Sequence, residues 1–333
     1  MMEIFLNKKI LFFAPQFFGY EIEIKNKLKE LGTEVDYYDE RMNPNNFEKF
    51  LIRFAKNTLK KKISVYYEKI IEDSKLKKYD CIFFLNPETV TKDLINKLRK
   101  NQPNAKFIIY MFDSLKNKKN VIEFIDLFDV HYTFDKNDCF LYPKFKFRPL
   151  FYLDEYRENS TYNTNNKYDL AFVGTIHSDR YEIIKKIKKE LASDNLNTFF
   201  FMYFPSKMIY VLRKIFDKTY KKTKMKDFRF SPLGKKEVLN ILSHSNVVLD
   251  IQHPNQTGLT MRTIEILGLK KKLITTNKDI ENYDFYSEKN IYIIDRDNPI
   301  IDKKFFEEQY VDIEKKVYLN YSIESWLIEI FNF

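Results

Sequence analysis

The sequence predicts an α/β protein made of two doubly wound domains. Its 333 residues exceed what a single hydrophobic core usually serves. Short segments that are apolar throughout alternate with charged amphipathic segments, which indicates parallel strands covered by helices on both faces. This alternation breaks once near the middle of the chain and then begins again. We therefore expect two Rossmann-like domains that face a cleft.

The first half contains five expected strands and the helices between them. The strands are at 9–15, 34–39, 80–86, 106–113 and 130–135, and the helices are at 21–32, within 46–78, at 88–100 and at 120–128. The first helix is expected to end at Gly32, because glycine is favoured just after a helix C-terminus. These elements make up a first domain, 1–151.

Residues 152–167 are polar, rich in Asn and without a periodic apolar face, which indicates a linker. The second domain, 168–318, has expected strands at 168–175, 197–204, 246–252, 271–277 and 291–295, and helices at 178–191, 206–216, 234–245 and 259–269. A terminal helix within 319–333 has one apolar face, formed by Ile323, Trp326, Leu327 and Ile330. It is placed so that it can cross back to the first domain.

The composition favours a folded protein with an anionic partner. Hydrophobic residues make up 44% of the chain, and 57 Lys and Arg against 47 Asp and Glu give a formal net charge of +10. That charge suits a nucleic acid, a phosphorylated small molecule or an acidic membrane surface, although a lysine-rich solvated surface explains it equally well. Cys81 and Cys139 are isolated, and the four histidines show no ligand spacing, so no disulfide framework or metal site is expected.

The first residues show no signal-peptide pattern, and no run approaches the roughly 18 apolar residues of a membrane span. We therefore expect a soluble cytoplasmic protein.

Two junctions between a strand and a helix in the second half have the chemistry of an anion site. Ligands of open α/β sheets bind beyond the carboxyl ends of the strands. Gly174 and Thr175 end one expected strand, and Arg180 lies one turn into the next helix. Gly174 permits close approach of the backbone, although a tight turn alone would also use glycine.

The second junction is HPNQTGLTMRTIE, residues 253–265, where a helix is expected to begin near Thr260. The amides and dipole of a helix N-terminus favour phosphate, and Gly258 lets the backbone come close. Arg262 offers charge-assisted hydrogen bonds to the same anion, and Glu265, one turn further on, is suited to a ribose diol. The alternative is an ordinary glycine turn followed by an Arg–Glu surface pair.

Residues 231–277 (SPLGKKEVLNILSHSNVVLDIQHPNQTGLTMRTIEILGLKKKLITTN) resemble the donor-binding half of group 1 glycosyltransferases with the GT-B fold. The resemblance is closest to the divergent branch that works in bacterial lipopolysaccharide and capsule synthesis. It implies that Glu265 binds the nucleotide ribose. It also implies that a loop meets the diphosphate and sugar, namely Gln256, Thr257, Gly258, Leu259 and Thr260.

The chain departs from the commoner motif of that family at one position. The family has a first glutamate eight residues before the second, and this sequence has Thr257 there. Gln256 is the candidate to replace the contact with the sugar.

The resemblance makes the first half the acceptor side. Residues 13–23 resemble the family's flexible loop. If the reaction inverts the anomeric centre, a base is needed, and three residues are candidates: Asp113, Glu21 and His131. Each has a capping or surface role as its alternative, and a retaining reaction needs no dedicated base.

A basic segment, 207–226, carries eight Lys or Arg and one acid, Asp217. Met208, Ile209, Leu212, Ile215 and Phe216 form an apolar stripe along it. Such a helix suits an anionic bilayer surface, where lipid-linked acceptors reside, but a stripe this narrow also suits burial against the sheet, which is the slightly favoured interpretation.

The sequence thus favours a glycosyltransferase that takes a nucleotide-sugar donor and a surface-glycan or lipid-linked acceptor. No cofactor and no metal is expected, since helix dipoles and Arg or Lys can hold the diphosphate. We expect the protein in the cytoplasm, with the inner face of the cytoplasmic membrane as an option. The alternatives are a nucleic-acid-binding protein, which dispersed basic residues and buried aromatics disfavour, and a non-catalytic protein that binds a sugar nucleotide.

Overall fold

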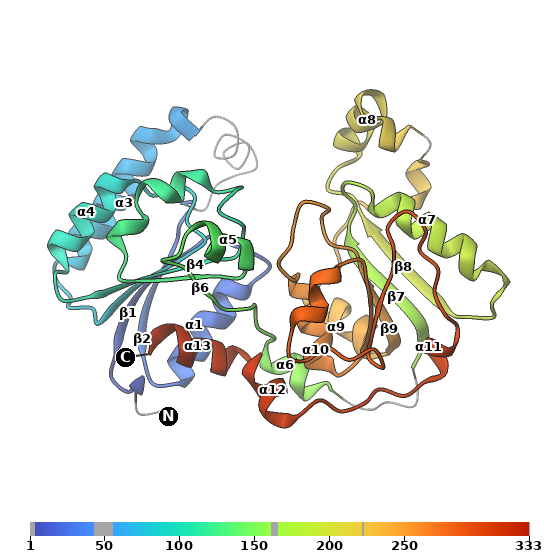
Figure 1. Cartoon of the computed structure of the whole chain (residues 1–333). Helices are drawn as coiled ribbons and strands as arrows, with labels where there is room; N and C mark the ends of the chain where they lie inside the picture. Colours follow the sequence, from blue (N-terminus) through green and yellow to red (C-terminus); the bar gives the residue numbers. More distant parts are fainter. Residues whose placement is uncertain (1–3, 43–55, 161–165, 222, 333) are drawn as a thin grey trace. The chain divides into compact units, whose positions relative to one another are not determined.

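The computed structural model describes residues 4–42, 56–160, 166–221 and 223–332. The chain divides into two compact units: unit 1 comprises Met1–Leu150 and Ile323–Phe333, and unit 2 comprises Phe151–Ser322 (Figure 1). The terminal helix α13 (Ile323–Phe331) therefore belongs to the first unit, in line with the expected option that it crosses back to the first domain. Of the segment expected to be a linker, 152–167, the described residues 152–160 and 166–167 lie in unit 2, and helix α6 (Asp154–Glu158) forms within them.

Unit 1 is built on a six-stranded sheet whose strands are all parallel, in the order β2-β1-β3-β4-β5-β6. The strands are β1 (Lys9–Ala14), β2 (Glu34–Asp39), β3 (Cys81–Leu85), β4 (Lys106–Met111), β5 (Val130–Thr133) and β6 (Lys146–Phe147). The α-helices are α1 (Tyr20–Glu30), α3 (Lys60–Ser74), α4 (Lys92–Asn101), α5 (Lys136–Leu141) and α13. Short 3-10 helices are η2 (Lys56–Leu59), η3 (Lys119–Glu123) and η4 (Ile125–Leu127).

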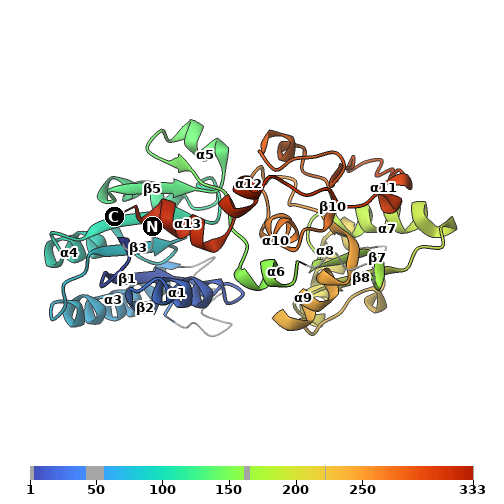
Figure 2. The ribbon, with the colours of Figure 1, turned by 90° about the horizontal axis from the view of Figure 1, so that it is seen from below.

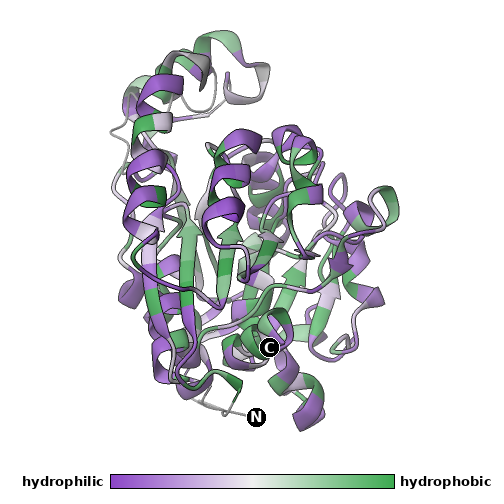
Figure 3. Ribbon diagram, turned by 90° about the vertical axis from the view of Figure 1, so that its left-hand side faces the viewer, coloured by the Kyte–Doolittle hydropathy of each residue, from purple (hydrophilic) through white to green (hydrophobic). Residues whose placement is uncertain are grey.

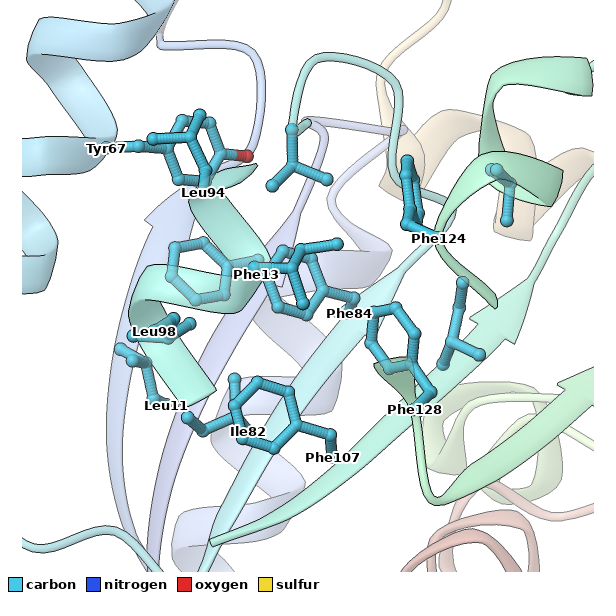
Figure 4. Close-up of a cluster of buried hydrophobic side chains, with 14 of the residues drawn as sticks. Leu11, Phe13, Tyr67, Ile82, Phe84, Leu94, Leu98, Phe107, Phe124 and Phe128 are labelled. Atoms are coloured by element: carbon cyan, nitrogen blue, oxygen red, sulfur yellow. The ribbon is translucent and has the colours of Figure 1, made fainter. Parts of the chain in front are cut away.

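Helices cover both faces of this sheet, which explains why the inner strands β1, β3 and β4 have no polar side. Successive side chains of a strand point to opposite faces. Phe13 and Phe84 pack with Tyr67 of α3 on one face (Figure 4). On the other face, Trp326 of α13 meets the ring of Tyr110, with ring centres 4.8 Å apart. α13 thus closes the second face of unit 1 (Figure 2). Hydrophobic colouring is concentrated in the strands, and much of the helical surface is hydrophilic (Figure 3).

Two local details of unit 1 follow from its sequence. Gly32 has a φ of +99° just after α1, the left-handed conformation that glycine adopts at no steric cost. Residues 120–128, expected to form one α-helix, instead form η3 and η4. The carbonyl of Ile125 accepts from the Phe128 N–H and contacts Nε2 of His131, so it is held in a tight turn rather than in an α-helical bond.

Unit 2 has a five-stranded parallel sheet in the order β11-β10-β9-β7-β8. Its strands are β7 (Tyr168–Thr175), β8 (Thr198–Tyr203), β9 (Ser245–Asp250), β10 (Lys272–Thr275) and β11 (Ile291–Ile293). Its helices after α6 are α7 (Arg180–Glu190), α8 (Lys207–Phe216), α9 (Lys235–Ser243), α10 (Met261–Leu269), α11 (Lys304–Glu307) and α12 (Lys315–Asn320). The 3-10 helices are η5 (Leu191–Ser193), η6 (Lys218–Tyr220), η7 (Met225–Asp227) and η8 (Lys278–Asn282).

Two parallel sheets with interleaved helices confirm the predicted fold class. Each unit has its own buried hydrophobic cluster. No helix in the described part of the chain is both long and apolar enough to cross a bilayer.

Candidate functional site

The strand order of unit 2 places a switch point between β7 and β9. The chain leaves β7 for β8 on one side, and β9 pairs with β7 on the other. Ligands of doubly wound sheets bind in the crevice that forms at such a point. Arg180 bridges the two strand ends: its Nη1 donates to the carbonyl of Thr175 (2.9 Å) and its Nε to the carbonyl of Ile251 (2.5 Å). A Cβ at Gly174 would lie 3.0 Å from Cζ of Phe172, which is a tight contact, and 3.5 Å from Nη1 of Arg180, which is an ordinary one.

Helix α10 begins beside the same point, and Thr260 is its N-cap. The Thr260 hydroxyl accepts from the Thr263 N–H and donates to Oδ2 of Asp250 at 2.5 Å. The Thr263 hydroxyl donates to the same carboxylate oxygen at 2.8 Å. The buried Asp250 at the end of β9 therefore fixes the helix N-terminus against the sheet. The first amides of α10 have no intrahelical backbone acceptor, and that of Thr263 donates to the Thr260 hydroxyl instead.

The loop before α10 is held by its own polar groups. Nε2 of Gln256 donates to the carbonyl of Gly258 (2.9 Å), and Nδ2 of Asn277 donates to the carbonyl of Thr257 (3.1 Å). Leu259 is buried, whereas the side chain of Thr257 is exposed. The backbone of the loop is thus preorganised, and its exposed threonine occupies the position where the related motif has a glutamate.

Glu265 is buried, with 6% of its surface exposed, although it is a charged residue. The Tyr156 hydroxyl of α6 donates to Oε1 (2.7 Å), and Nη1 of Arg262 donates to Oε2 (2.6 Å). Tyr156 was missed in the sequence, because it lies in a polar stretch with no strand or motif next to it.

A third arginine, Arg296, also lies at this edge and was not a sequence candidate. It follows β11, and its guanidinium binds both carboxylate oxygens of Asp179 at 2.8 and 2.9 Å. It also donates to the Thr276 hydroxyl (2.9 Å) and to the carbonyl of Gln252 (3.0 Å). Asp179 stands before α7 but makes no side-chain cap; it pairs with Arg296 instead. The rule that functional residues follow strand ends would have found Arg296 after the last strand.

Residues 295–297 form an Asp-x-Asp sequence. The expectation that the site needs no metal did not consider this segment. Carboxylates of this kind can hold Mg²⁺ together with substrate phosphates. In this structure Oδ1 of Asp295 accepts from the backbone N–H groups of Asp297 (2.8 Å) and Asn298 (3.0 Å), so that carboxylate shapes the turn. Within the described ranges, no group of three or more His, Cys, Asp or Glu is placed to hold a metal ion.

The electrostatics of this edge favour an anion. Burial lowers the pKa of Arg180, and the guanidinium groups of Arg262 and Arg296 lower it further, while Asp250 opposes them. His177 follows β7, and its ring centre is 5.4 Å from that of His253. Burial and the charge of Arg180, with smaller effects of His253 and Arg213, lower the pKa of His177 to about 4. Burial is the first cause of this shift and the charge of Arg180 the second; the same positive charge also attracts phosphate groups.

The three candidate bases lie in unit 1 in different settings. Asp113 follows β4 and is partly exposed; its Oδ1 accepts from the Ser114 N–H (3.0 Å) and from Nδ2 of Asn117 (2.9 Å). Glu21, in the first turn of α1, is buried, and its Oε2 accepts from the Phe17 N–H (3.0 Å). Both belong to segments that follow a strand's carboxyl end.

His131 is placed differently from the other two candidates. It lies near the start of β5 rather than at its carboxyl end. It is buried among Phe128 and Phe145, its Nε2 is 2.7 Å from the carbonyl of Ile125, and burial lowers its pKa. The structure therefore gives His131 a packing role and does not bring it to the edge where a base would work.

Solved structures resemble this chain over nearly its whole length. An α-glucosyltransferase in complex with UDP and a 13-mer DNA has a TM-score of 0.63 and 14% identity, covering 97% of this chain and 98% of that one. The Anabaena protein Alr3699/HepE, in complex with UDP and glucose, has a TM-score of 0.61 and 9% identity, with coverage of 98% and 99%. The chain has the GT-B fold. No family model and no curated protein matches the sequence.

Other proteins with a similar structure differ in their chemistry. The lipopolysaccharide outer core galactosyltransferase WaaB has a TM-score of 0.50 and 12% identity, covering 97% of this chain and 99% of that one. The UDP-GlcNAc 2-epimerase of Methanocaldococcus jannaschii has a TM-score of 0.51 and 13% identity, with coverage of 97% and 99%. At such identities the likeness defines the GT-B fold, and the residues of the site have to carry the argument about function.

Proposed function

We propose that this protein is a glycosyltransferase that moves a sugar from a nucleotide-sugar donor, with UDP as the nucleotide to test first. The observation that carries the proposal is the group of three arginines at the switch point of unit 2, next to the N-terminus of α10. Similar structures of the GT-B fold hold UDP or UDP-glucose, which supports a nucleoside diphosphate as the anion.

In this proposal, different residues of unit 2 bind the diphosphate, the ribose and the sugar of the donor. The amides at the start of α10 and of the loop at Gly258 receive the diphosphate, as helix N-termini commonly do. Arg180, Arg262 and Arg296 provide the positive field. Glu265 accepts hydrogen bonds from the ribose hydroxyls while Tyr156 and Arg262 hold its carboxylate in place. Gln256 and Thr257 face the sugar.

The chemical role of this site is to stabilise the leaving nucleotide. Negative charge grows on the diphosphate as the glycosidic bond breaks, and prearranged donors in a partly buried site stabilise that charge most effectively. We propose that this stabilisation needs no metal ion. Retained donor binding and turnover after treatment with EDTA would support this, and loss that Mg²⁺ restores would contradict it.

The acceptor side of the proposal rests on unit 1. Asp113 is the preferred base if the reaction inverts, because its carboxylate is partly exposed at the carboxyl end of β4. Glu21 remains a second candidate. We further propose a surface glycan of the lipopolysaccharide or capsule type as the acceptor, with the protein acting at the inner face of the cytoplasmic membrane. The likeness to WaaB supports this acceptor class.

A thermal-shift titration tests the donor. We expect UDP and one or more UDP-sugars to raise the melting temperature, with GDP, CMP and dTDP compounds as comparison. Glu265→Gln should weaken UDP binding by roughly tenfold, since it replaces an acceptor by a donor at the ribose, about 1.4 kcal/mol. Tyr156→Phe is the matched control, because it removes one hydrogen-bond donor to Glu265 but leaves the carboxylate that binds the ribose. Its UDP binding should therefore weaken less than that of Glu265→Gln. Absence of stabilisation by any nucleotide would refute the proposal.

Turnover separates the activities that the GT-B fold supports. Release of UDP that depends on an added glycan acceptor identifies a transferase. Conversion of UDP-GlcNAc to an isomer without any acceptor would identify an epimerase instead, an outcome that the likeness to UDP-GlcNAc 2-epimerases makes worth measuring. Duplex DNA belongs in the acceptor panel because one similar structure contains it.

A further inference from the structure

Helix α8 of unit 2 exposes a large apolar surface. Six side chains are exposed, among them Met208 at 70% and Phe216 at 82%; the full set is Met208, Ile209, Val211, Leu212, Ile215 and Phe216. At 100° per residue these positions span an arc of about 160° on one side of the helix. This corrects the favoured expectation that the apolar stripe packs against the sheet. We call this surface the α8 face.

The opposite side of α8 contacts the protein around Tyr210, the one residue of this helix that is buried. Tyr210 is buried, and its hydroxyl binds Thr223. Nη1 of Arg213 donates to the Tyr220 hydroxyl (3.2 Å), and Nζ of Lys214 donates to the carbonyl of Thr223 (2.9 Å). A surface helix of a globular protein normally turns its apolar side inward. In α8 the apolar side is exposed, so hydrophobic burial within unit 2 does not account for the α8 face.

We propose that the α8 face inserts into the interfacial region of an anionic lipid bilayer, with the surrounding lysines and arginines contacting lipid phosphates. Contiguous exposed apolar side chains mark sites of interaction. Segment 207–226 has a net charge of +7, from eight Lys or Arg and one Asp. Among these, Lys221, Lys224 and Lys226 are exposed. An apolar face beside dense positive charge matches the two forces that hold amphipathic helices at anionic membranes.

The same charge argues against a second copy of this chain as the occupant. A symmetric dimer through the α8 face would bring two +7 segments together. The length of the helix decides how it meets a bilayer. Ten residues span about 15 Å, half the thickness of the hydrocarbon layer, so α8 must lie in the plane of the surface rather than cross it.

The position of α8 connects this surface with the site. The helix follows the carboxyl end of β8, the same edge of the sheet at which Arg180 and Arg296 lie. Figure 1 shows α8 at the margin of unit 2, away from α9. The inference rests on the proposed function in one respect: bilayer contact at this edge would keep the donor site near lipid-linked acceptors. Its test measures lipid binding alone.

The experiment is co-sedimentation of the full chain with vesicles of phosphatidylcholine alone or mixed equally with phosphatidylglycerol. We expect binding to the anionic vesicles, at least tenfold weaker binding to phosphatidylcholine, and weakening by 0.5 M NaCl. Ile215→Ser with Phe216→Ser should reduce anionic-vesicle binding at least tenfold. Both side chains are exposed, so the variant should fold. Leu76→Ser with Phe140→Ser is the matched control, because these side chains are 90% and 87% exposed in unit 1.

The outcomes separate this inference from the proposed function. Stabilisation by UDP should be equal in wild type and in the α8 variant. UDP stabilisation without vesicle binding overturns the inference about α8 and leaves the transferase proposal standing. Vesicle binding without stabilisation by any nucleotide supports the inference about α8 and refutes the transferase proposal. Vesicle binding that both variants reduce equally also overturns the inference. The inference is also overturned if wild type binds no vesicles but forms a dimer that the α8 variant abolishes, because a second copy of the chain then covers the α8 face.

Discussion

Arg296 ties three segments at the edge of the sheet with one guanidinium: Asp179 before α7, Thr276 after β10 and the carbonyl of Gln252. Arg296→Lys keeps the charge and removes the planar set of donors. We expect unit 2 to lose about 1–3 kcal/mol of unfolding free energy and UDP binding to weaken about three- to tenfold. Calorimetric titration with UDP and thermal unfolding measure the two effects. Unchanged UDP affinity would mean that Arg296 is a structural tie only. Arg99→Lys, whose guanidinium pairs with Asp129 in unit 1, is the matched control for UDP binding.

His177 lies at the same edge, and burial, followed by the charge of Arg180, lowers its pKa. Its pKa is lowered to about 4, below the value of about 6.5 in an unfolded chain, so the folded protein binds fewer protons there. The stability that this residue contributes is complete above about pH 6.5 and is lost as the pH falls toward 4. Between pH 7.5 and 5, wild type should therefore lose more stability than His177→Gln. UDP should raise the pKa of His177, since its phosphates offset the arginines. NMR titration of the four histidines measures this directly; an unmoved His177 would contradict a diphosphate at this position.

Single residues show where sequence reasoning works and where it stops. Thr260, Arg262 and Glu265 were found because they lie within one turn or two of a local helix start. Tyr156, Asp250 and Arg296 act on that site from other segments, and their importance comes from tertiary contacts that no local pattern encodes. The candidate bases had only strand ends as their signal, and His131, which lies in an apolar strand, packs against Phe128 and Phe145 in unit 1.

At the scale of elements, α10 packs closely against the start of unit 2. A Cβ on Gly268 would lie 2.7 Å from Cγ and 2.8 Å from Cβ of Tyr152, which is fixed because its hydroxyl donates to the carbonyl of Tyr318. Gly268→Ala should therefore destabilise unit 2 by about 1–3 kcal/mol, although alanine favours helices. Thermal unfolding measures the loss. Gly234→Ala is the control, since a Cβ there meets only the carboxylate end of Glu237 at 3.4 Å. Equal stability of both variants would show that Tyr152 can move aside.

Glu40 connects the end of β2 to the segment after β3. This fully buried carboxyl accepts from the N–H groups of Glu88, Thr89 and Val90, and burial raises its pKa to about 7. The folded chain therefore binds more protons there than the unfolded chain, and the contribution of Glu40 to stability falls as the pH rises from about 4.5 through 7. Glu40→Gln should remove this dependence. We measure the unfolding free energy of wild type and of Glu40→Gln at pH 5 and at pH 8. From pH 5 to pH 8, wild type should lose stability relative to Glu40→Gln. A constant difference would contradict the raised pKa.

Element boundaries show the same limits as the residues. Long apolar strands and the helices between them followed from periodicity, because burial on both faces of a parallel sheet leaves a strong signal. Periodicity did not predict the 3-10 turns at 119–127 or helix α6, because hydrogen bonds to particular carbonyls and tertiary packing determine these elements. The orientation of α8 was also beyond the sequence: amphipathicity defines an apolar side but not whether that side meets the protein.

At the scale of the whole molecule, each unit has a separate sheet and a separate hydrophobic cluster, and the single tryptophan, Trp326, lies in unit 1 against Phe83 and Tyr110. Tryptophan fluorescence therefore reports the unfolding of unit 1, whereas circular dichroism reports both units. UDP binds unit 2 in our proposal, and a ligand that binds only the folded state stabilises it by mass action, about 2.7 kcal/mol at a hundredfold excess over the dissociation constant. We expect saturating UDP to raise the transition seen by circular dichroism and to leave the fluorescence transition nearly unchanged. Equal shifts in both signals would show that the two units unfold as one cooperative block. A shift confined to fluorescence would place the nucleotide in unit 1 and contradict the proposed site.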